Sequence, residues 1–435
     1  MTPALPGRLY RPLLHLMLAT LAADIILTGG FMLLRVPPVG PGVPVNEIVL
    51  GLGLGALLLG GRGLGGIAET PAFAALCALW VLAAGHLILD VPRRGAWAIR
   101  DAANMIEGGF FVIGFALAED GRFRPALTRW LNAVFPAAAC YALLYPFQAW
   151  LVRFSPSVAS MSGYDAPLFF TFVDTSSVAL TAVCHILLRD RWPPLARSLV
   201  AGLVVMVLIA FAQTRITYPQ IVFLAALLGL SARRELARFA RAGAVAALLL
   251  ALFLASGVHL PGRLGQTVSL DFLVSHVQAT WGGGGASTRD AAAGVDLRLG
   301  WWAEIHRDLA RSPAEWFLGL GYGMPLTPFR GVSDDVVREP HNSYVSVYGR
   351  LGCVGIALFL AFLATTAGTS ARLIRLARGD AEFSAAALTI ACFLGMHAIY
   401  ALGEGGMEVS FVAVPFYFLA GAQAAMLRRA EREAP

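Results

Sequence analysis

Residues 340–355 read PHNSYVSVYGRLGCVG, beginning with Pro340, His341 and Asn342 and ending with Gly355. This stretch lies where a long hydrophilic segment gives way to an apolar run long enough to cross a bilayer. A histidine at such a boundary is sheltered enough to act as an acid or base, yet a substrate can reach it from water or from the lipid headgroups. We therefore expect chemistry at His341, at the surface of a membrane domain.

The composition of the chain indicates a membrane protein. Of its 435 residues, 57% are hydrophobic and 14% are charged, and the mean hydropathy is +0.69. Soluble domains carry about 25% charged residues, so most of this chain is expected to be solvated by lipid. All 33 basic side chains are arginines, and the five cysteines lie inside apolar stretches without the paired spacing of a metal site. We expect no metal, no cofactor and no nucleic-acid partner.

Apolar runs divide the chain into candidate spans. The expected fold is all-α and polytopic, with about twelve transmembrane helices and one large external loop before the tenth. The expected spans are 13–34, 45–60, 71–89, 102–117, 131–151, 167–188, 198–212, 218–230, 242–258, 342–366, 383–402 and 409–426.

The arginines predict the orientation of these spans. Starting with the amino terminus inside, the cytoplasmic connections carry most of the arginine clusters, which satisfies the positive-inside rule with both termini in the cytoplasm. We thus expect an N-terminal bundle of about nine helices (1–258), a large external loop (259–341) and about three C-terminal helices (342–435). Within the loop, Leu297, Trp301, Ile305 and Leu309 recur at helical spacing and predict an amphipathic helix that rests on the bundle.

The setting of His341 distinguishes it from the other histidines. Asn342 follows it, Gly352 and Gly355 allow close helix packing below it, and the whole external loop leads to it. Tyr344 and Tyr348 are expected to pack along the same helix. The histidines that lie inside apolar spans without such a setting are interpreted as structural: His15, His86, His185 and His397.

The His-Asn pair at the head of a helix, followed by Gly352-x-x-Gly355, resembles the motif of the O-antigen ligase and O-antigen polymerase superfamily, which are bacterial integral membrane glycosyltransferases. The layout of about twelve spans with one large external loop is similar too. Further similarities are an arginine (Arg298), a tryptophan a few residues on and a glycine-rich turn, and the pair Thr214-Arg215 at the external end of a span. The family has an acidic residue nine positions after the histidine, where this chain has Arg350.

The resemblance implies an inverting glycosyltransferase of the bacterial inner membrane. Such an enzyme moves a glycan from an undecaprenyl diphosphate carrier to a sugar hydroxyl at the periplasmic face, and membrane lipids surround it. In this scheme His341 is the general base. Asn342 orients the imidazole or bonds a sugar hydroxyl, with helix capping as an equal alternative.

Arginines are the natural anchors for the diphosphate, because guanidinium groups meet phosphate oxygens in bidentate fashion. Arg215 is the first candidate and Arg298 the second, whereas binding of ordinary headgroups or an ion pair on a solvated helix would explain each of them without catalysis. Acidic residues near the membrane are functional candidates by default, and a structural ion pair with Arg215, Arg298 or Arg350 is the simpler interpretation. The supporting acids are Asp174, Glu404 and Glu408.

Three kinds of function remain open from the sequence. A polymerase would extend an O-antigen or exopolysaccharide chain on its carrier, and a ligase would hand the finished chain to the lipid A core of lipopolysaccharide. Arg350 in place of the usual acid favours the polymerase slightly. A transporter or flippase for lipid-linked glycans is the alternative, although no repeat relates 1–217 to 218–435. A scaffold in an envelope complex is the third interpretation.

Overall fold

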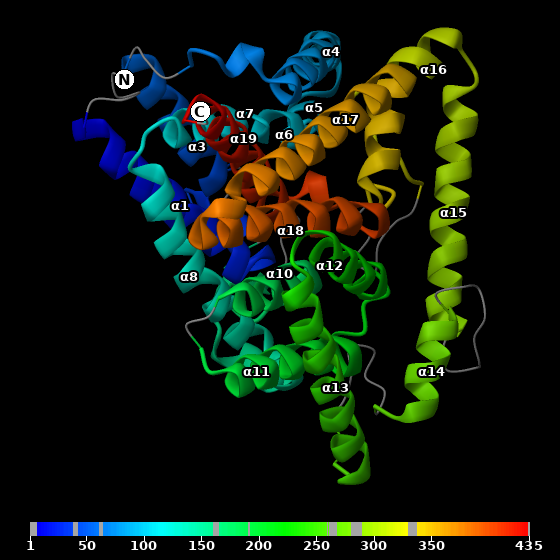
Figure 1. Ribbon diagram of the computed structural model, residues 1–435. Coiled ribbons are helices and arrows are strands. Elements are labelled where there is room, and N and C mark those ends of the chain that lie inside the picture. Colours follow the sequence, from blue (N-terminus) through cyan, green and yellow to red (C-terminus); the bar gives the residue numbers. More distant parts are fainter. Residues whose placement is uncertain are drawn as a thin grey trace.

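The computed structural model describes residues 7–37, 42–60, 64–159, 165–189, 192–258, 260, 268–279, 289–328 and 337–433. Most of the expected external loop is thus described, apart from 259, 261–267, 280–288 and 329–336. Figure 1 shows the helices layered on one another, with α15 running along one side of the bundle. The fold is that of an all-α membrane protein.

The first half of the chain contains α1 (Gly7–Leu27), α2 (Gly29–Met32), α3 (Val45–Gly60), α4 (Pro71–Arg94), α5 (Ala96–Asp101), α6 (Ala103–Glu107), α7 (Gly109–Ala118), α8 (Phe123–Ala142) and α9 (Gln148–Leu151). Then follow α10 (Thr175–Leu188), α11 (Pro194–Val207), α12 (Thr217–Ser231) and α13 (Arg233–Ala255). The loop region contains α14 (Leu270–Ala279), α15 (Arg289–Leu309) and α16 (Pro313–Leu318), and the chain ends with α17 (Ser343–Leu376), α18 (Ala381–Gly403) and α19 (Ser410–Glu433). Two antiparallel hairpins pair β1 (Arg35–Val36) with β2 (Val43–Pro44) and β3 (Ser157–Ala159) with β4 (Asp165–Pro167).

Judged by their length, fewer helices can span a membrane than the sequence predicts. Among the described residues, 7 helices are long and apolar enough to cross a membrane, or up to 8 if the bent pair Phe123–Ala142 and Tyr145–Phe154 forms one span. Every other expected span contains an apolar helix of 10–17 residues. Fourteen residues of helix, as in α10, reach only about 21 Å, against roughly 30 Å of hydrocarbon. A window of apolar residues overestimates the length of such helices, because it also counts the apolar loop residues beside them.

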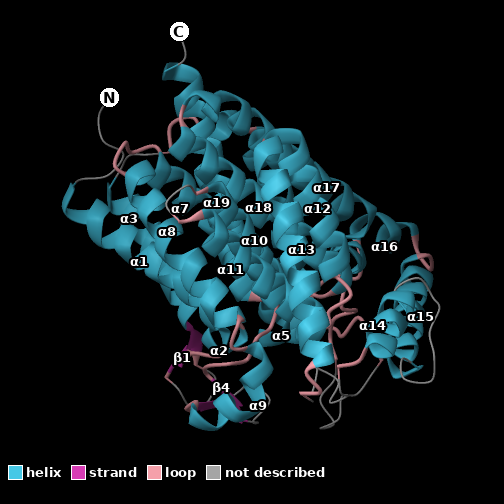
Figure 2. Cartoon of the chain, turned by 60° about the horizontal axis from the view of Figure 1, so that its bottom comes forward, coloured by secondary structure: helices cyan, strands magenta, loops and turns pink. Residues whose placement is uncertain are grey.

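Ion pairs gather the expected cytoplasmic connections at one end of the bundle. Arg428 of α19 lies 2.8 Å from Glu69, in the connection before α4, and 3.7 Å from Glu119, in the connection after α7. Arg124, at the start of α8, pairs with Asp380, just before α18. Figure 2 shows both termini at this end, whereas the two hairpins, α9, α14 and α15 lie toward the other. The grouping of the connections thus follows the arginine pattern.

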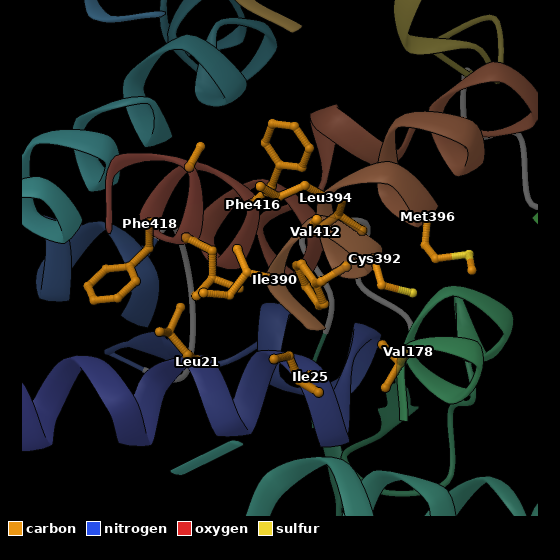
Figure 3. Close-up of a cluster of buried hydrophobic side chains, with 14 of the residues drawn as sticks. Leu21, Ile25, Val178, Ile390, Cys392, Leu394, Met396, Val412, Phe416 and Phe418 are labelled. Carbon is orange, nitrogen blue, oxygen red and sulfur yellow. The ribbon is translucent and has the colours of Figure 1, made fainter. Parts of the chain in front are cut away.

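The centre of the bundle is α19, which is buried on every side. Residues 410–427 are all buried, since the helix is apolar around its full circumference. Its backbone touches that of α7, because a Cβ on Gly114 would collide with the carbonyl of Phe418 and one on Gly421 with that of Phe111. Figure 3 shows side chains of α18 and α19 meeting those of α1 and α10 in this core.

The motif helix α17 is bent at Gly352, about two and a half turns after its first residue, Ser343. This residue has φ 66° and ψ −163°, a conformation open essentially to glycine alone. The bend leaves two carbonyls of α17 without partners inside the helix, and these accept hydrogen bonds from the glycine-rich loop after α16. Leu320 N donates to Gly349 O (2.9 Å), and Gly321 N donates to Arg350 O (3.0 Å). A Cβ on Gly352 would lie 2.5 Å from the backbone of Phe317. The glycines of the motif and of the loop therefore interlock backbone against backbone.

Gly352→Ala is expected to destabilise the protein by roughly 2 to 4 kcal/mol. Alanine is strained at this φ, and its methyl group would collide with the backbone of Phe317. Gly368→Ala is the matched control on the same helix, since a Cβ there has open space around it. The measurement is thermal unfolding in detergent. Equal midpoints for the two variants would contradict the interlocked arrangement.

Candidate active site at the amino end of α17

Asn342 caps α17 and holds it against the end of α18. Its Oδ1 accepts hydrogen bonds from the backbone N–H groups of Tyr344 (2.9 Å) and Val345 (3.1 Å), while Nδ2 donates to the carbonyl of Leu402 (2.9 Å). These bonds satisfy two of the free donors at the helix start. All the polar atoms of the side chain are thus occupied by backbone. Asn342 fits the capping alternative, and the structure gives it no contact with the imidazole.

His341 stands just before the cap in a strained backbone conformation, with φ 52°. Its imidazole is 40% exposed, and its Nδ1 lies 3.1 Å from Oε2 of Glu404, the residue that follows α18. An ionised carboxylate can only accept, so Nδ1 carries the proton in the neutral ring. That tautomer leaves the lone pair of Nε2 available to take a proton.

Arg298 of α15 completes a chain of three charged or polar groups. Its guanidinium lies 3.2 Å from Oε1 of Glu404 and donates to the carbonyl of Gly403 at 2.7 Å. Burial raises the pKa of the Glu404 carboxyl, but the hydrogen bond from His341 and the charge of Arg298 more than offset this, and the net shift is downward. Glu404 is therefore an ionised acceptor at neutral pH. It holds the imidazole on one oxygen and the guanidinium on the other.

Tryptophans of α15 cover the histidine. The ring of Trp301 stacks on that of His341, with centroids 6.2 Å apart and planes 25° from parallel. Trp302 Nε1 donates to the carbonyl of Pro340 at 3.0 Å. Since Arg298, Trp301 and Trp302 lie within about one turn, a single face of α15 packs on the segment that carries His341. The amphipathic helix expected from the sequence is present and lies at this site.

Arg215 follows the π-helix Leu208–Ala212, in the short connection before α12. Burial, together with the neighbouring charge of Arg298, lowers the pKa of its guanidinium. Within the described part of the chain it forms no hydrogen bond or ion pair, and it is half-buried. Two arginines from distant segments thus repel each other, and only one is neutralised by an acid. Such a pair suits an anion that contacts both.

Arg350 lies away from His341 and has a structural role. Its guanidinium is 6% exposed, lies 3.0 Å from Oδ2 of Asp101, and donates to the carbonyls of Gly321 and Met324. Arg338 binds the same Asp101 carboxylate through two hydrogen bonds of 3.0 and 2.7 Å. Arg350 thus joins α17 to α5 and to the glycine-rich loop. Nothing in the sequence singled out Asp101 as its partner.

Glu408 lies behind the site, where its Oε2 accepts a 2.6 Å hydrogen bond from the hydroxyl of Ser343. That hydroxyl in turn accepts from the N–H of Met407 at 2.9 Å. Asp174 lies elsewhere, inside the bundle, 3.2 Å from Nε2 of His397. The expected ion pairs with arginine are therefore corrected for these two acids: Glu408 binds a serine and Asp174 a histidine. Glu404 does pair with an arginine, Arg298.

The structure thus brings four of the predicted site residues together: His341, Glu404, Arg298 and Arg215. Three others support the surrounding structure: Asn342, Glu408 and Arg350. Asp174 lies apart from the site. In the described part of the chain, no three His, Cys, Asp or Glu side chains gather as metal ligands. No protein-family model matches this sequence, and no curated protein matches it. The fold and the site therefore define the protein as a polytopic α-helical membrane protein with a histidine–carboxylate–arginine cluster at one end.

Glu404→Gln is expected to lower any proton-transfer activity of His341 by about 100-fold, because a neutral amide neither holds the Nδ1–H tautomer nor neutralises Arg298. Glu304→Gln on α15 is the control, since that side chain has no ion pair within the described residues. The readout is the rate of the glycan transfer that the resemblance implies, measured with purified protein. A Glu404→Gln enzyme as fast as wild type would exclude a role of the carboxylate in catalysis.

Proposed function

We propose that this protein is a lipid-linked glycan transferase that uses His341 as general base and arginines as anchors for a diphosphate leaving group. The observation that carries the proposal is the His341–Glu404 hydrogen bond, which leaves Nε2 as the basic nitrogen while Arg298 binds the other oxygen of the same carboxylate. The similarity of the His-Asn helix and of its loop to the O-antigen ligase and polymerase superfamily agrees with it.

The reaction is one displacement at the anomeric carbon of the donor sugar. A hydroxyl oxygen of the acceptor sugar attacks that carbon while its proton passes to Nε2 of His341. The bond between the anomeric carbon and the phosphate oxygen breaks, and its electron pair leaves with the lipid diphosphate. Attack opposite the leaving group inverts the configuration. The ionised Glu404 stabilises the imidazolium that forms, as the acid of a catalytic triad does.

The leaving diphosphate gains negative charge, which fixed cations must stabilise. Arg215 has its guanidinium free to bind phosphate oxygens, and Arg298 presents the donors that Glu404 and Gly403 do not occupy. Arg215 lies in a short connection between two apolar helices, so in this proposal a lipid-anchored donor would reach the two arginines without leaving the bilayer. The chemistry needs no metal ion when two guanidinium groups are in place.

The proposal places this end of the protein in the periplasm. The opposite end collects the arginine-rich connections and both termini, which by the positive-inside rule belong in the cytoplasm. We propose the bacterial inner membrane as its location. The four shorter apolar helices would complete twelve spans if the bilayer thins around them or their flanking residues reach the headgroups.

Between the two versions of the transfer, we favour a polymerase of O-antigen or exopolysaccharide over a ligase that uses lipid A core. The reason is Arg350, which replaces the acid that the superfamily carries nine positions after the histidine. In this chain that position joins α17 to Asp101, so the acid's role at the site is not filled by Arg350.

Glycan profiling of a deletion strain, with and without the wild-type protein, tests the proposal. Single repeat units that accumulate on the lipid carrier in the deletion strain would support a polymerase. Long chains left on the carrier and missing from lipid A would support a ligase. An unchanged profile would contradict a glycosyltransferase.

A transporter or flippase for lipid-linked glycans is the second candidate. The Asp174–His397 pair favours it, because an ionisable pair buried inside a bundle of apolar helices is typical of proton pathways. In that case glycans would accumulate on the cytoplasmic leaflet in the deletion strain, where they resist enzymes added from outside.

A further inference from the structure

Two carboxylates meet behind the catalytic segment. Glu339 precedes His341 by two residues, and Glu408 ends the short turn that begins with Glu404. Both point at Gly405: a Cβ built there would lie 3.1 Å from Oε2 of Glu339 and 3.3 Å from Oε2 of Glu408. The segment that carries the base and the turn that carries its carboxylate thus approach each other at Gly405, with one acid from each segment beside it.

Neither carboxylate is neutralised by a cation. In the described part of the chain Glu339 and Glu408 form no ion pair, and Oε1 of Glu408 is buried without a hydrogen-bond partner. The nearest arginines are engaged by Asp101, which binds Arg338 and Arg350 together. The charged and titratable groups that interact with the two acids are Arg100, Asp101, Tyr322, Arg350 and Tyr417.

The surroundings disfavour two negative charges. Glu339, Glu408, Arg350 and Tyr322 line one small pocket. Buried polar atoms without a partner in the described residues also face this pocket, among them the Tyr322 hydroxyl, in a residue that is 1% exposed, and Oδ1 of Asn104. Burial and the charge of Glu408 raise the pKa of Glu339 to about 8, and burial raises that of Glu408. Two carboxylates that share one site keep one proton between them.

We propose that Glu339 and Glu408 share one proton near neutral pH, and that this acid pair is a positioning device that holds Glu404 against His341. With the proton present, the two segments attract through a carboxylic acid–carboxylate hydrogen bond. Without it, two negative charges repel across Gly405, and the 404–408 turn moves away from the 339–343 segment. The base then loses the carboxylate that orients it.

The sign of the pH effect follows from the direction of the pKa shift. The folded protein keeps a proton that the unfolded chain releases near the ordinary glutamate pKa of about 4.3. The contribution of this pair to stability is therefore greatest below that value and declines as the pH rises toward about 8, where the folded pair also loses the proton.

Infrared spectroscopy of the purified protein tests the shared proton without any assay of activity. A protonated carboxyl absorbs separately from a carboxylate, so the difference spectrum of wild type minus Glu339→Gln should show such a band at pH 7 that disappears as the pH passes about 8. Glu408→Gln should move the loss of the band to lower pH, because the like charge beside Glu339 is removed while its burial remains. Glu315→Gln is the control at the same end of the bundle. A difference spectrum without the band, or a band lost at the same pH in Glu408→Gln as in wild type, would overturn the proposal.

The positioning role rests on the proposed function and has its own readout. Wild-type transfer should fall about tenfold between pH 7 and pH 9 as the proton is lost, and Glu339→Gln should abolish most of that fall. An unchanged alkaline fall in the variant would overturn the positioning role even if the band behaves as expected. If wild type transfers no glycan at any pH, the proposed function fails while the infrared result still decides whether the pair holds a proton.

Discussion

His341→Ala is expected to lower the rate of glycan transfer by about 10³-fold or more while the protein remains folded in the membrane. General-base catalysis contributes about 10² to 10⁴ in rate, and this site has no second base at the same place. The imidazole is held by Glu404, stacked on Trp301 and open to substrate at Nε2. Its removal takes away the proton acceptor and leaves the arginine anchors in place, so donor binding should survive.

The measurement is single-turnover transfer by purified protein in detergent, with donor binding followed in parallel. His306→Ala is the matched control, since that exposed histidine lies on α15 and contacts Tyr348 and Trp316 outside the cluster. We expect His306→Ala to keep most of the activity. Normal product from His341→Ala would exclude the base role, and loss of donor binding along with transfer would point to a structural role of the histidine.

Arg215→Lys is expected to lower transfer by about 10²-fold although it keeps the positive charge. A guanidinium presents a planar fork that matches two phosphate oxygens, whereas an ammonium is a point charge. Loss of one such contact to a developing charge costs about 10² to 10³ in rate. Because Arg215 has no partner of its own in the described residues, its substitution breaks no internal ion pair.

The corresponding control is Arg311→Lys, an arginine just after α15 that is 71% exposed and pairs with Asp308 at 2.9 Å. It should behave as wild type. The rate at saturating donor separates the two interpretations of Arg215. A purely headgroup-binding arginine would leave that rate unchanged, and full activity of Arg215→Lys would exclude it as the anchor for the leaving group.

Much of the site could be predicted from local sequence, because its parts lie at boundaries between apolar and polar segments. His341 and Asn342 stand at the start of a long apolar run, Arg298 on an amphipathic stretch, and Glu404 in a turn between two spans. An ionisable group at such a boundary costs free energy unless it is used or paired, so each was recognisable by type and position. The all-α membrane fold follows in the same way from the length of the apolar runs.

Pairing between distant segments could not be predicted this way. From the sequence, each acid could pair with any of three arginines. The packing of α15 against the turn after α18 brings Glu404 into contact with Arg298 and His341. Asp174 instead pairs with His397. Arg350 stands where the superfamily has an acidic residue, and only the tertiary structure shows that it pairs with Asp101. These choices depend on helix crossings and on backbone contacts that no short window contains.

The amino-acid sequence by itself determined that the chain is a bundle of apolar helices, and that His341 lies at the head of one of them. Hydropathy and charge act locally, so these properties can be read residue by residue. Only the tertiary structure decided which carboxylate orients the histidine, which arginine stays free and which acids lie back to back behind the site. The reason is that a charge removed from water takes the partner that packing brings within reach, however distant that partner is along the chain.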